Sequence, residues 1–275
     1  MNALWSPGPV LVTGPCVVDR DDVMLHVAER VAELGSRLGV RVVFKASFDK
    51  ANRSHGGAAR GPGLDGGLAV LRRVRDASGL PVLTDVHEAW QVPKAAAVVD
   101  ALQIPAFLCR QTDLLVAAGR TGLPINIKRG QWMSPEEMTG AVAKVRRAGS
   151  EAVALTERGT FFGYGDLVVD MRAFDRMRRA AGVPVLFDAT HAVQQPGRGA
   201  EGSSGGLRAH VPALAAAAAA AGADGWFIET HPEPAASPSD AATIWPLRDL
   251  EPLVERVLAV WHAAREGREA PWSIR

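Results

Sequence analysis

The stretch VRVVFKASFDKANRS, residues 40–54, combines an apolar run with a loop rich in cations. Its first part, Val40–Phe44, is typical of a strand that is buried on both faces. The loop after it carries cations and neutral hydrogen-bonding groups: Lys45, Lys50, Asn52, Arg53 and Ser54. Ammonium and guanidinium groups bind phosphates and carboxylates, while amides and hydroxyls fix the orientation of the bound anion. The stretch therefore predicts an anion site at the end of a buried strand.

A solvated surface loop is the alternative interpretation, and the distribution of lysine argues against it. Among the 31 Lys and Arg residues, lysine occurs only at positions 45, 50, 94, 128 and 144. Two of these lie in the loop, and Lys128 ends another apolar run. In a chain that otherwise uses arginine, such placement indicates a chemical role for the lysines.

Short apolar runs of the same kind recur and alternate with helical patterns. The predicted strands are Val10–Val12, Val40–Phe44, Pro81–Thr84, Ala101–Ile104, Pro124–Ile127, Ala152–Leu155, Pro184–Phe187 and Trp226–Ile228. Predicted helices are Asp21–Leu38, a helix ending near Ala77, Glu88–Val99, Thr112–Ala118, a helix begun by Ser134, Pro135 and Glu137, Asp166–Ala181, Ala209–Ala221 and Leu247–His262. Eight β–α units without a compositional break predict one domain, residues 1–275, folded as a closed (β/α)8 TIM barrel rather than an open sheet.

The composition excludes several classes of protein. A net charge of +1 provides no field that would recruit nucleic acid or an anionic membrane. Two cysteines, Cys16 and Cys109, make no disulfide framework and fit a reducing compartment. The N-terminus does not resemble a signal peptide, and the alanine-rich run Val211–Ala223 is too short to span a bilayer. We therefore expect a soluble, cytoplasmic protein.

Polar and charged residues follow the predicted strands where each strand ends. They include Cys16, Lys45, Asp85, His87, Gln103, Arg110, Lys128, Glu157, Arg158, Asp188, His191, Glu229 and His231. In α/β barrels these ends meet at one mouth, where active sites lie. After the seventh strand, the Gly/Ser-rich segment Gln194–Gly206 is either a lid over that mouth or an ordinary flexible loop.

The cations form the first candidate cluster. Its members are Lys45, Lys50, Arg53, Lys128 and Arg158, with Arg208 as a candidate sixth. They exceed what one phosphate requires, which suggests two anionic substrates or one substrate with several anionic groups. Each could instead form a structural salt bridge, but unpaired charges facing a barrel core are costly, so the whole set favours anion binding.

A second candidate cluster would hold a metal. It consists of Cys16, His191, Glu229 and Asp240. Taken singly, Cys16 could be a small buried residue and His191 a hydrogen-bonded core histidine. A thiolate, an imidazole and two carboxylates together would suit Zn²⁺, Fe²⁺ or Mn²⁺.

At these residues the chain resembles the 3-deoxy-D-manno-octulosonate 8-phosphate synthase family. The motifs that carry the resemblance are GPC (14–16), FKASFDKANRS (44–54), TDVHE (84–88), QIPAFLCRQTDLL (103–115), NIKRGQW (126–132), TERG (156–159), FDATHAVQQPG (187–197), SGGLR (204–208) and FIETHPEP (227–234). Members condense phosphoenolpyruvate with arabinose 5-phosphate and release phosphate, in the synthesis of a lipopolysaccharide inner-core sugar. Related heptulosonate synthases have a Lys-Pro-Arg-Thr/Ser element where this chain has KANRS.

The resemblance assigns roles to the strand-end residues. Those implied to bind phosphoenolpyruvate are Lys128 and Arg158, helped by Lys45, Lys50, Gln103 and the backbone at Ala106. Those implied to bind the sugar phosphate are Arg53 and Ser54, with Asn52 and Asp85 on the sugar and Arg208 added when the loop closes. The sequence departs from the expected pattern at His55, which follows KANRS where a small hydroxyl residue is expected.

The resemblance also implies a cofactor and an assembly. Family members with Cys in the first motif depend on a divalent metal, so Cys16, His191, Glu229 and Asp240 would be its ligands, while members with Asn there need none. His191 and His87 are candidates for proton handling, and Asp85 and Lys128 complete the candidate catalytic set. The family resemblance suggests a homotetramer.

Three other functions remain open from the sequence. One is a heptulosonate 7-phosphate synthase that uses erythrose 4-phosphate. Another is an aldolase in which Lys128 forms a Schiff base, because a strand-end lysine in a barrel also suits that chemistry. The third is a sugar-phosphate sensor without catalysis, for which the metal cluster would have no explanation.

Overall fold

The computed structural model describes residues 3–5, 8–51, 60–199 and 204–266. Eight parallel strands form a closed barrel, because β1 pairs with both β2 and β12. The barrel strands are β1 (Val10–Gly14), β2 (Arg41–Lys45), β3 (Val82–Asp85), β4 (Ala101–Ile104), β5 (Ile125–Lys128), β6 (Val153–Glu157), β9 (Val185–Asp188) and β12 (Gly225–His231). The predicted (β/α)8 barrel is thus confirmed.

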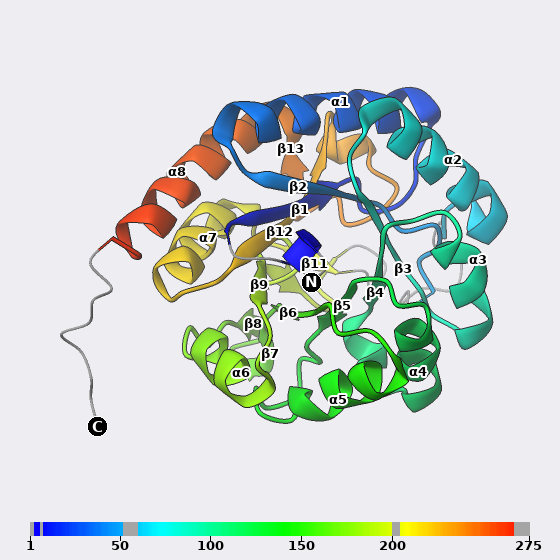
Figure 1. Ribbon diagram of the computed structural model, residues 1–275. Coiled ribbons are helices and arrows are strands. Elements are labelled where there is room, and N and C mark those ends of the chain that lie inside the picture. Colours follow the sequence, from blue (N-terminus) through cyan, green and yellow to red (C-terminus); the bar gives the residue numbers. More distant parts are fainter. Residues whose placement is uncertain (1–2, 6–7, 52–59, 200–203, 267–275) are drawn as a thin grey trace.

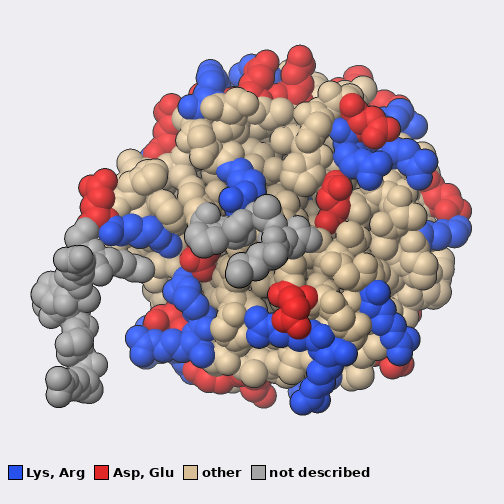
Figure 2. Space-filling view, in the orientation of Figure 1, with Lys and Arg blue, Asp and Glu red and all other residues tan. Residues whose placement is uncertain are grey.

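Helices surround the barrel, as the view along its axis in Figure 1 shows. They are α1 (Asp21–Leu38), α2 (Gly63–Ser78), α3 (Val92–Ala96), α4 (Thr112–Arg120), α5 (Met138–Ala148), α6 (Ala173–Ala181), α7 (Val211–Ala220) and α8 (Leu250–Ala263). Their apolar faces pack on the outside of the strands and form the larger hydrophobic core. Lys and Arg alternate with Asp and Glu around the rim of the face in Figure 2, so that face carries no patch of one sign.

The interior of the barrel changes character from one end to the other. At the N-terminal end a short 3-10 helix, η1 (Ala3–Trp5), places Leu4 and Trp5 against inward-facing apolar residues such as Val12 and Leu186. At the C-terminal end the inward positions carry Lys, Asp, Gln and Glu instead. Because side chains alternate along a strand, one apolar layer and one polar layer follow from the same strands. The polar layer faces the mouth.

One predicted helix is wrong over its first part. The segment expected to be helical from Asp166 begins with a strand, β8 (Asp166–Val168), which pairs antiparallel with β7 (Thr160–Gly163). Tyr164 and Gly165 connect them with φ angles of 52° and 81°. Two positive φ values are what a tight two-residue hairpin turn requires. The helical pattern is realised only from Ala173 onwards.

Other boundaries also differ from the predictions. The helix expected over Glu88–Val99 is a 3-10 turn, η2 (Ala89–Gln91), followed by α3, and its start is fixed by Gln91 Oε1 accepting from the backbone of His87 and Glu88. The helix expected from Ser134 begins at Met138, although Glu137 does accept a hydrogen bond from the Ser134 backbone at 2.8 Å. The 3-10 turns η5 (Arg208–His210) and η7 (Leu247–Asp249) replace the first residues expected of α7 and α8. Within the described residues no helix is long and apolar enough to cross a membrane.

Candidate active site

A cavity of about 670 Å³ lies at the C-terminal mouth of the barrel. The predicted site residues that line it are Lys45, Lys50, Asp85, His87, Gln103, Ala106, Lys128, Arg158, His191 and Asp240. Arg208 does not line it, but its guanidinium donates to the carbonyl of Ala241, which does. The predicted sugar-phosphate residues Asn52, Arg53 and Ser54, and also His55, lie outside the described residues. The mouth therefore gathers residues from all four quarters of the chain.

Lys128 ends β5 and is almost completely buried. Its ammonium forms an ion pair with Asp188 at the end of β9 and lies 3.1 Å from the centre of the Phe227 ring. Burial lowers the pKa of Lys128 to about 8, and the neighbouring Asp188 opposes that shift only in part. A lysine in these surroundings can carry a positive charge for an anion near neutral pH, and it can give the proton up at a modest rise in pH.

Asp85, at the end of β3, is a meeting point for hydrogen bonds. Its carboxylate accepts from the Gln103 amide and from the Ser47 hydroxyl, whose oxygen accepts in turn from Lys50 Nζ at 3.0 Å. Lys45 Nζ lies 3.8 Å from Asp85. Burial alone would raise the pKa of Asp85, but Lys45 and Lys50 hold it well below its usual range. The residue is an ionised anchor that spaces two lysines in the mouth.

The predicted metal ligands Cys16, Glu229 and Asp240 come together. One donor atom from each lies within 4.8 Å of the others. Burial raises the pKa of the Cys16 thiol well above its usual value, and the two carboxylates raise it further. The thiol therefore keeps its proton in this structure and donates it to Asp240 Oδ2 at 2.9 Å. A divalent cation between these groups would favour the thiolate.

His191 lies next to this trio but is turned partly towards Asp188. Its Nδ1 is 2.8 Å from Asp188 Oδ2, while Nε2 is 3.7 Å from Glu229 Oε2. That Glu229 oxygen is buried and accepts no hydrogen bond from the described residues. A buried carboxylate oxygen without a donor, beside a thiol and an imidazole, fits a site for a soft or borderline divalent cation.

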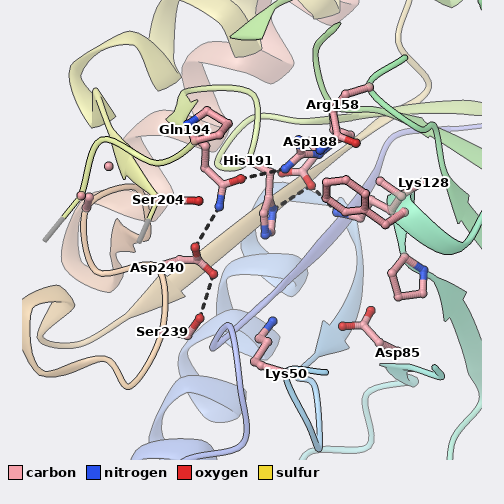
Figure 3. Close-up of a pocket in the computed structure, with 18 of the residues that line it drawn as sticks. Lys50, Asp85, Lys128, Arg158, Asp188, His191, Gln194, Ser204, Ser239 and Asp240 are labelled. Carbon is pink, nitrogen blue, oxygen red and sulfur yellow. Dashed lines mark hydrogen bonds and ion pairs between the residues drawn. The ribbon is translucent and has the colours of Figure 1, made fainter. Parts of the chain in front are cut away.

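Gln194 links the cation side of the mouth to the metal-ligand side (Figure 3). Its Oε1 accepts from Arg158 at 2.8 Å, and its Nε2 donates to Asp240 Oδ1 at 2.8 Å. Ser239 also donates to Asp240, which adopts a left-handed φ of 51°. Gln194 begins the short ribbon of β10 (Gln194–Gln195) and β11 (Gly205–Gly206) within the segment predicted as a lid. Residues 200–203 of that segment lie outside the described residues, and its closure over the mouth stays a prediction.

Comparison with known proteins identifies the family. The chain matches the model of the DAHP synthetase I family over residues 7–259. This chain belongs to the DAHP synthetase I family. It is 54% identical, over the full length of both proteins, to 2-dehydro-3-deoxyphosphooctonate aldolase of Rhodopseudomonas palustris (strain HaA2). Proteins of the same name from Syntrophotalea carbinolica and Nitratidesulfovibrio vulgaris (strain DP4) are 53% identical over 91% of this chain and 90% of the relative, and 52% identical over 95% of each.

In this DAHP synthetase I family member, the mouth also contains polar residues whose contacts the sequence does not predict. Asp188 was noted as a strand-end acid, yet its pairing with both Lys128 and His191 was not predicted. Ser47 and Gln194 were missed because a single Ser or Gln in a loop carries no spacing signal. Asp188 could have been found, since inward-facing cations on a barrel strand need an inward-facing acid nearby.

The remaining catalytic candidate, His87, lies between the β3 strand end and an aromatic neighbour. Its ring makes an edge contact with Phe48, with ring centres 5.8 Å apart. Burial lowers its pKa, against the pull of Asp85, and its Nδ1 has no hydrogen-bond partner among the described residues. In this family member His87 is therefore a neutral imidazole that lines the cavity and has a nitrogen available for proton exchange.

Proposed function

We propose that this protein condenses phosphoenolpyruvate with D-arabinose 5-phosphate and water. The products are 3-deoxy-D-manno-octulosonate 8-phosphate and inorganic phosphate, and the sugar serves lipopolysaccharide inner-core synthesis. The observation that carries the proposal is a set of cations around a cavity of about 670 Å³ at the mouth: the buried Lys45, Lys128 and Arg158 and the half-buried Lys50. Relatives named for the octonate product, 50–54% identical to this chain, support the choice of sugar.

In this reaction the nucleophilic carbon of phosphoenolpyruvate forms a bond to the aldehyde carbon of the sugar. Water adds to the former enol carbon, and the resulting tetrahedral intermediate expels phosphate. Two polyanions must approach one another, and neutralisation by fixed cations removes much of the repulsion. Lys128 and Arg158 would hold phosphoenolpyruvate, while Lys45 and Lys50, spaced by Asp85, would support its anionic groups.

A divalent metal such as Mn²⁺, Fe²⁺ or Zn²⁺ would be held by Cys16, His191, Glu229 and Asp240. A bound metal would supply Lewis-acid chemistry, either orienting the aldehyde or activating water. His87, through its Nδ1, and His191, poised between Asp188 and Glu229, are the residues that would exchange protons in the cavity. We further propose a cytoplasmic homotetramer, and sedimentation analysis of the purified protein would measure the assembly.

The decisive experiment is phosphate release from the two substrates by chelator-treated protein, with and without added Mn²⁺. Release that requires metal supports both the reaction and the metal site. Release without metal supports the reaction alone. A folded protein that releases no phosphate in either case contradicts the proposal, and release from erythrose 4-phosphate in preference to arabinose 5-phosphate would favour a heptulosonate 7-phosphate synthase.

The buried Lys128, with its pKa lowered to about 8, also fits a Schiff-base aldolase. Borohydride added during turnover distinguishes the two mechanisms. We expect no covalent adduct, because Lys128 is paired with Asp188 and would bind substrate through its charge. A trapped adduct on Lys128, located by peptide mass spectrometry, would replace the proposed mechanism.

A further inference from the structure

A chain of side-chain hydrogen bonds crosses four adjacent strands beneath the cavity. Thr156 Oγ1 donates to Asn126 Oδ1 at 2.7 Å, and Asn126 Nδ2 donates to Gln103 Oε1 at 2.8 Å. Gln103 Nε2 then donates to Asp85 Oδ1. Asn126 and Thr156 are completely buried and do not line the cavity, whereas Gln103 and Asp85 do. The two buried residues therefore have no direct access to a substrate.

Asp85 sets the donor-to-acceptor direction of this hydrogen-bond chain. An ionised carboxylate can only accept, so Gln103 must turn its Nε2 towards Asp85 and its Oε1 towards Asn126. Asn126 must then offer Nδ2 to Gln103, which leaves its Oδ1 for the Thr156 hydroxyl. Reversing any one amide would place two acceptors face to face in a buried site, which is costly. Each donor in the chain thus points towards Asp85.

Asp85 connects this hydrogen-bond chain to the cavity. Its other oxygen accepts from Ser47, which in turn accepts from Lys50 Nζ at 3.0 Å. The place of Lys50 therefore depends on where the Asp85 carboxylate is held, and Gln103 is the amide that holds it from the opposite side. A side chain that is locked by its neighbours keeps a site within the narrow geometric tolerance that catalysis needs.

From this geometry we infer that Asn126 and Thr156 are positioning residues for the candidate active site. They hold the Gln103 amide in the orientation that Asp85 requires, and through Gln103 they help to keep Asp85, Ser47 and Lys50 in place. The effect on turnover rests on the proposed function, whereas the direction of the hydrogen-bond chain does not. Two experiments separate these parts.

The first experiment compares Thr156→Val with Thr156→Ser. Valine has the shape of threonine but no donor, so Asn126 Oδ1 loses the hydrogen bond that holds the amide in place, while serine retains the hydroxyl. We expect kcat for phosphate release to fall about tenfold in Thr156→Val and to stay within about twofold of wild type in Thr156→Ser. The rate is referred to folded protein, so loss of stability alone would not change it. Equal kcat in the two variants would overturn the positioning role.

The second experiment needs no substrate and tests the direction of the chain. Asn126→Asp should lower the melting temperature, because the new carboxylate faces Gln103 Oε1. Adding Asp85→Asn lets the whole chain reverse, with the new amide at position 85 donating to Gln103 and Gln103 donating to the new acid. The double variant should melt roughly 3 °C or more above the value expected from adding the two single losses.

A matched control keeps the same net charge without restoring the direction. Asp113 is exposed on α4, so Asn126→Asp combined with Asp113→Asn should show additive losses. If the Asp85 pair is also additive, the inferred direction is wrong. If the wild type releases no phosphate while the Asp85 pair is coupled, the proposed function fails and the chain of hydrogen bonds stands.

Discussion

Lys128 and Cys16 each carry a pKa that burial has moved against the charged form that their proposed role requires. Lys128 is shifted down to about 8, within reach of physiological pH. The Cys16 thiol is shifted up, so it keeps its proton until a cation displaces it. The same physical cause, removal from water, thus disfavours the ammonium of one and the thiolate of the other.

The pH dependence of kcat/KM for phosphoenolpyruvate should report Lys128. Its ammonium loses a proton as the pH rises past about 8, so we expect kcat/KM to fall up to tenfold per pH unit above that point. Lys128→Arg, which stays charged throughout, should show lower activity but no such fall between pH 7 and 9.5. A flat wild-type profile over this range would contradict binding through the Lys128 charge.

Cys16→Asn should reduce the metal bound after dialysis against a metal buffer, measured by elemental analysis. The thiolate would be a strong ligand, whereas an amide is weak for Zn²⁺ or Fe²⁺. If the solution used by metal-independent relatives transfers, the variant should also lose sensitivity to chelators. Cys109→Ser is the control, since Cys109 contacts Met133 away from the trio, and it should leave metal content unchanged. Unchanged metal in Cys16→Asn would count against the ligand assignment.

Among the elements, the ends of β5 and β6 are joined by a completely buried ion pair. Arg129 donates to both Glu157 oxygens at 2.6 Å. It also donates to the carbonyl of Met133 at 2.6 Å and to Thr160 Oγ1 at 2.8 Å, which links the hairpin β7–β8 to the barrel. The arginine next to Lys128 in sequence therefore supports the rim rather than the cavity.

Arg129→Met should destabilise the fold by about 3–5 kcal/mol, because Glu157 is left charged and buried. The double variant Arg129→Met with Glu157→Leu should recover a large part of that loss, since an apolar pair leaves no charge unpaired. Urea unfolding of the three variants measures both effects. A double variant no more stable than Arg129→Met would show that the carbonyl contacts of Arg129, not its ion pair, provide the stability.

Elements formed by local interactions were predicted well from the sequence, whereas elements that depend on pairing with another segment were not. Helix α1, whose apolar residues follow a single period, was placed to the residue because local patterning decides it. The hairpin β7–β8 was missed, since the pairing of Thr160–Gly163 overrides the helical pattern of Asp166–Val168. Short amphipathic segments are ambiguous until their partner is known.

At the scale of the whole molecule, the eight β–α units and the polar residues that follow their strands were enough to predict the mouth. Lys45, Asp85, Gln103 and Lys128 all lie at or near strand ends, so a closed barrel necessarily brings them together. Contacts formed by irregular backbone could not be derived from that rule. Asp240, which is itself left-handed, reaches Cys16 from a loop, so the strand-end rule could not place this candidate ligand beside the thiol.

The balance of positive and negative charge at the mouth affects the protonation of Lys128 when a ligand binds. Over the described part of the chain, the cations and carboxylates there are equal in number: Lys45, Lys50, Lys128 and Arg158 against Asp85, Asp188, Glu229 and Asp240. An incoming phosphoenolpyruvate brings negative charge that this balance does not offset. At pH 8 Lys128 is about half deprotonated, so the ligand should draw a proton onto it.

Substrate capture should therefore consume protons from the medium. Calorimetric titration of phosphoenolpyruvate at pH 8 in two buffers with different ionisation enthalpies should give different heats, with an uptake of up to roughly half a proton. Lys128→Arg should bind with heats that do not depend on the buffer. Identical heats for the wild type would mean that other ions, not protons, compensate the charge of the ligand. Binding of phosphoenolpyruvate would then depend on salt concentration rather than on pH.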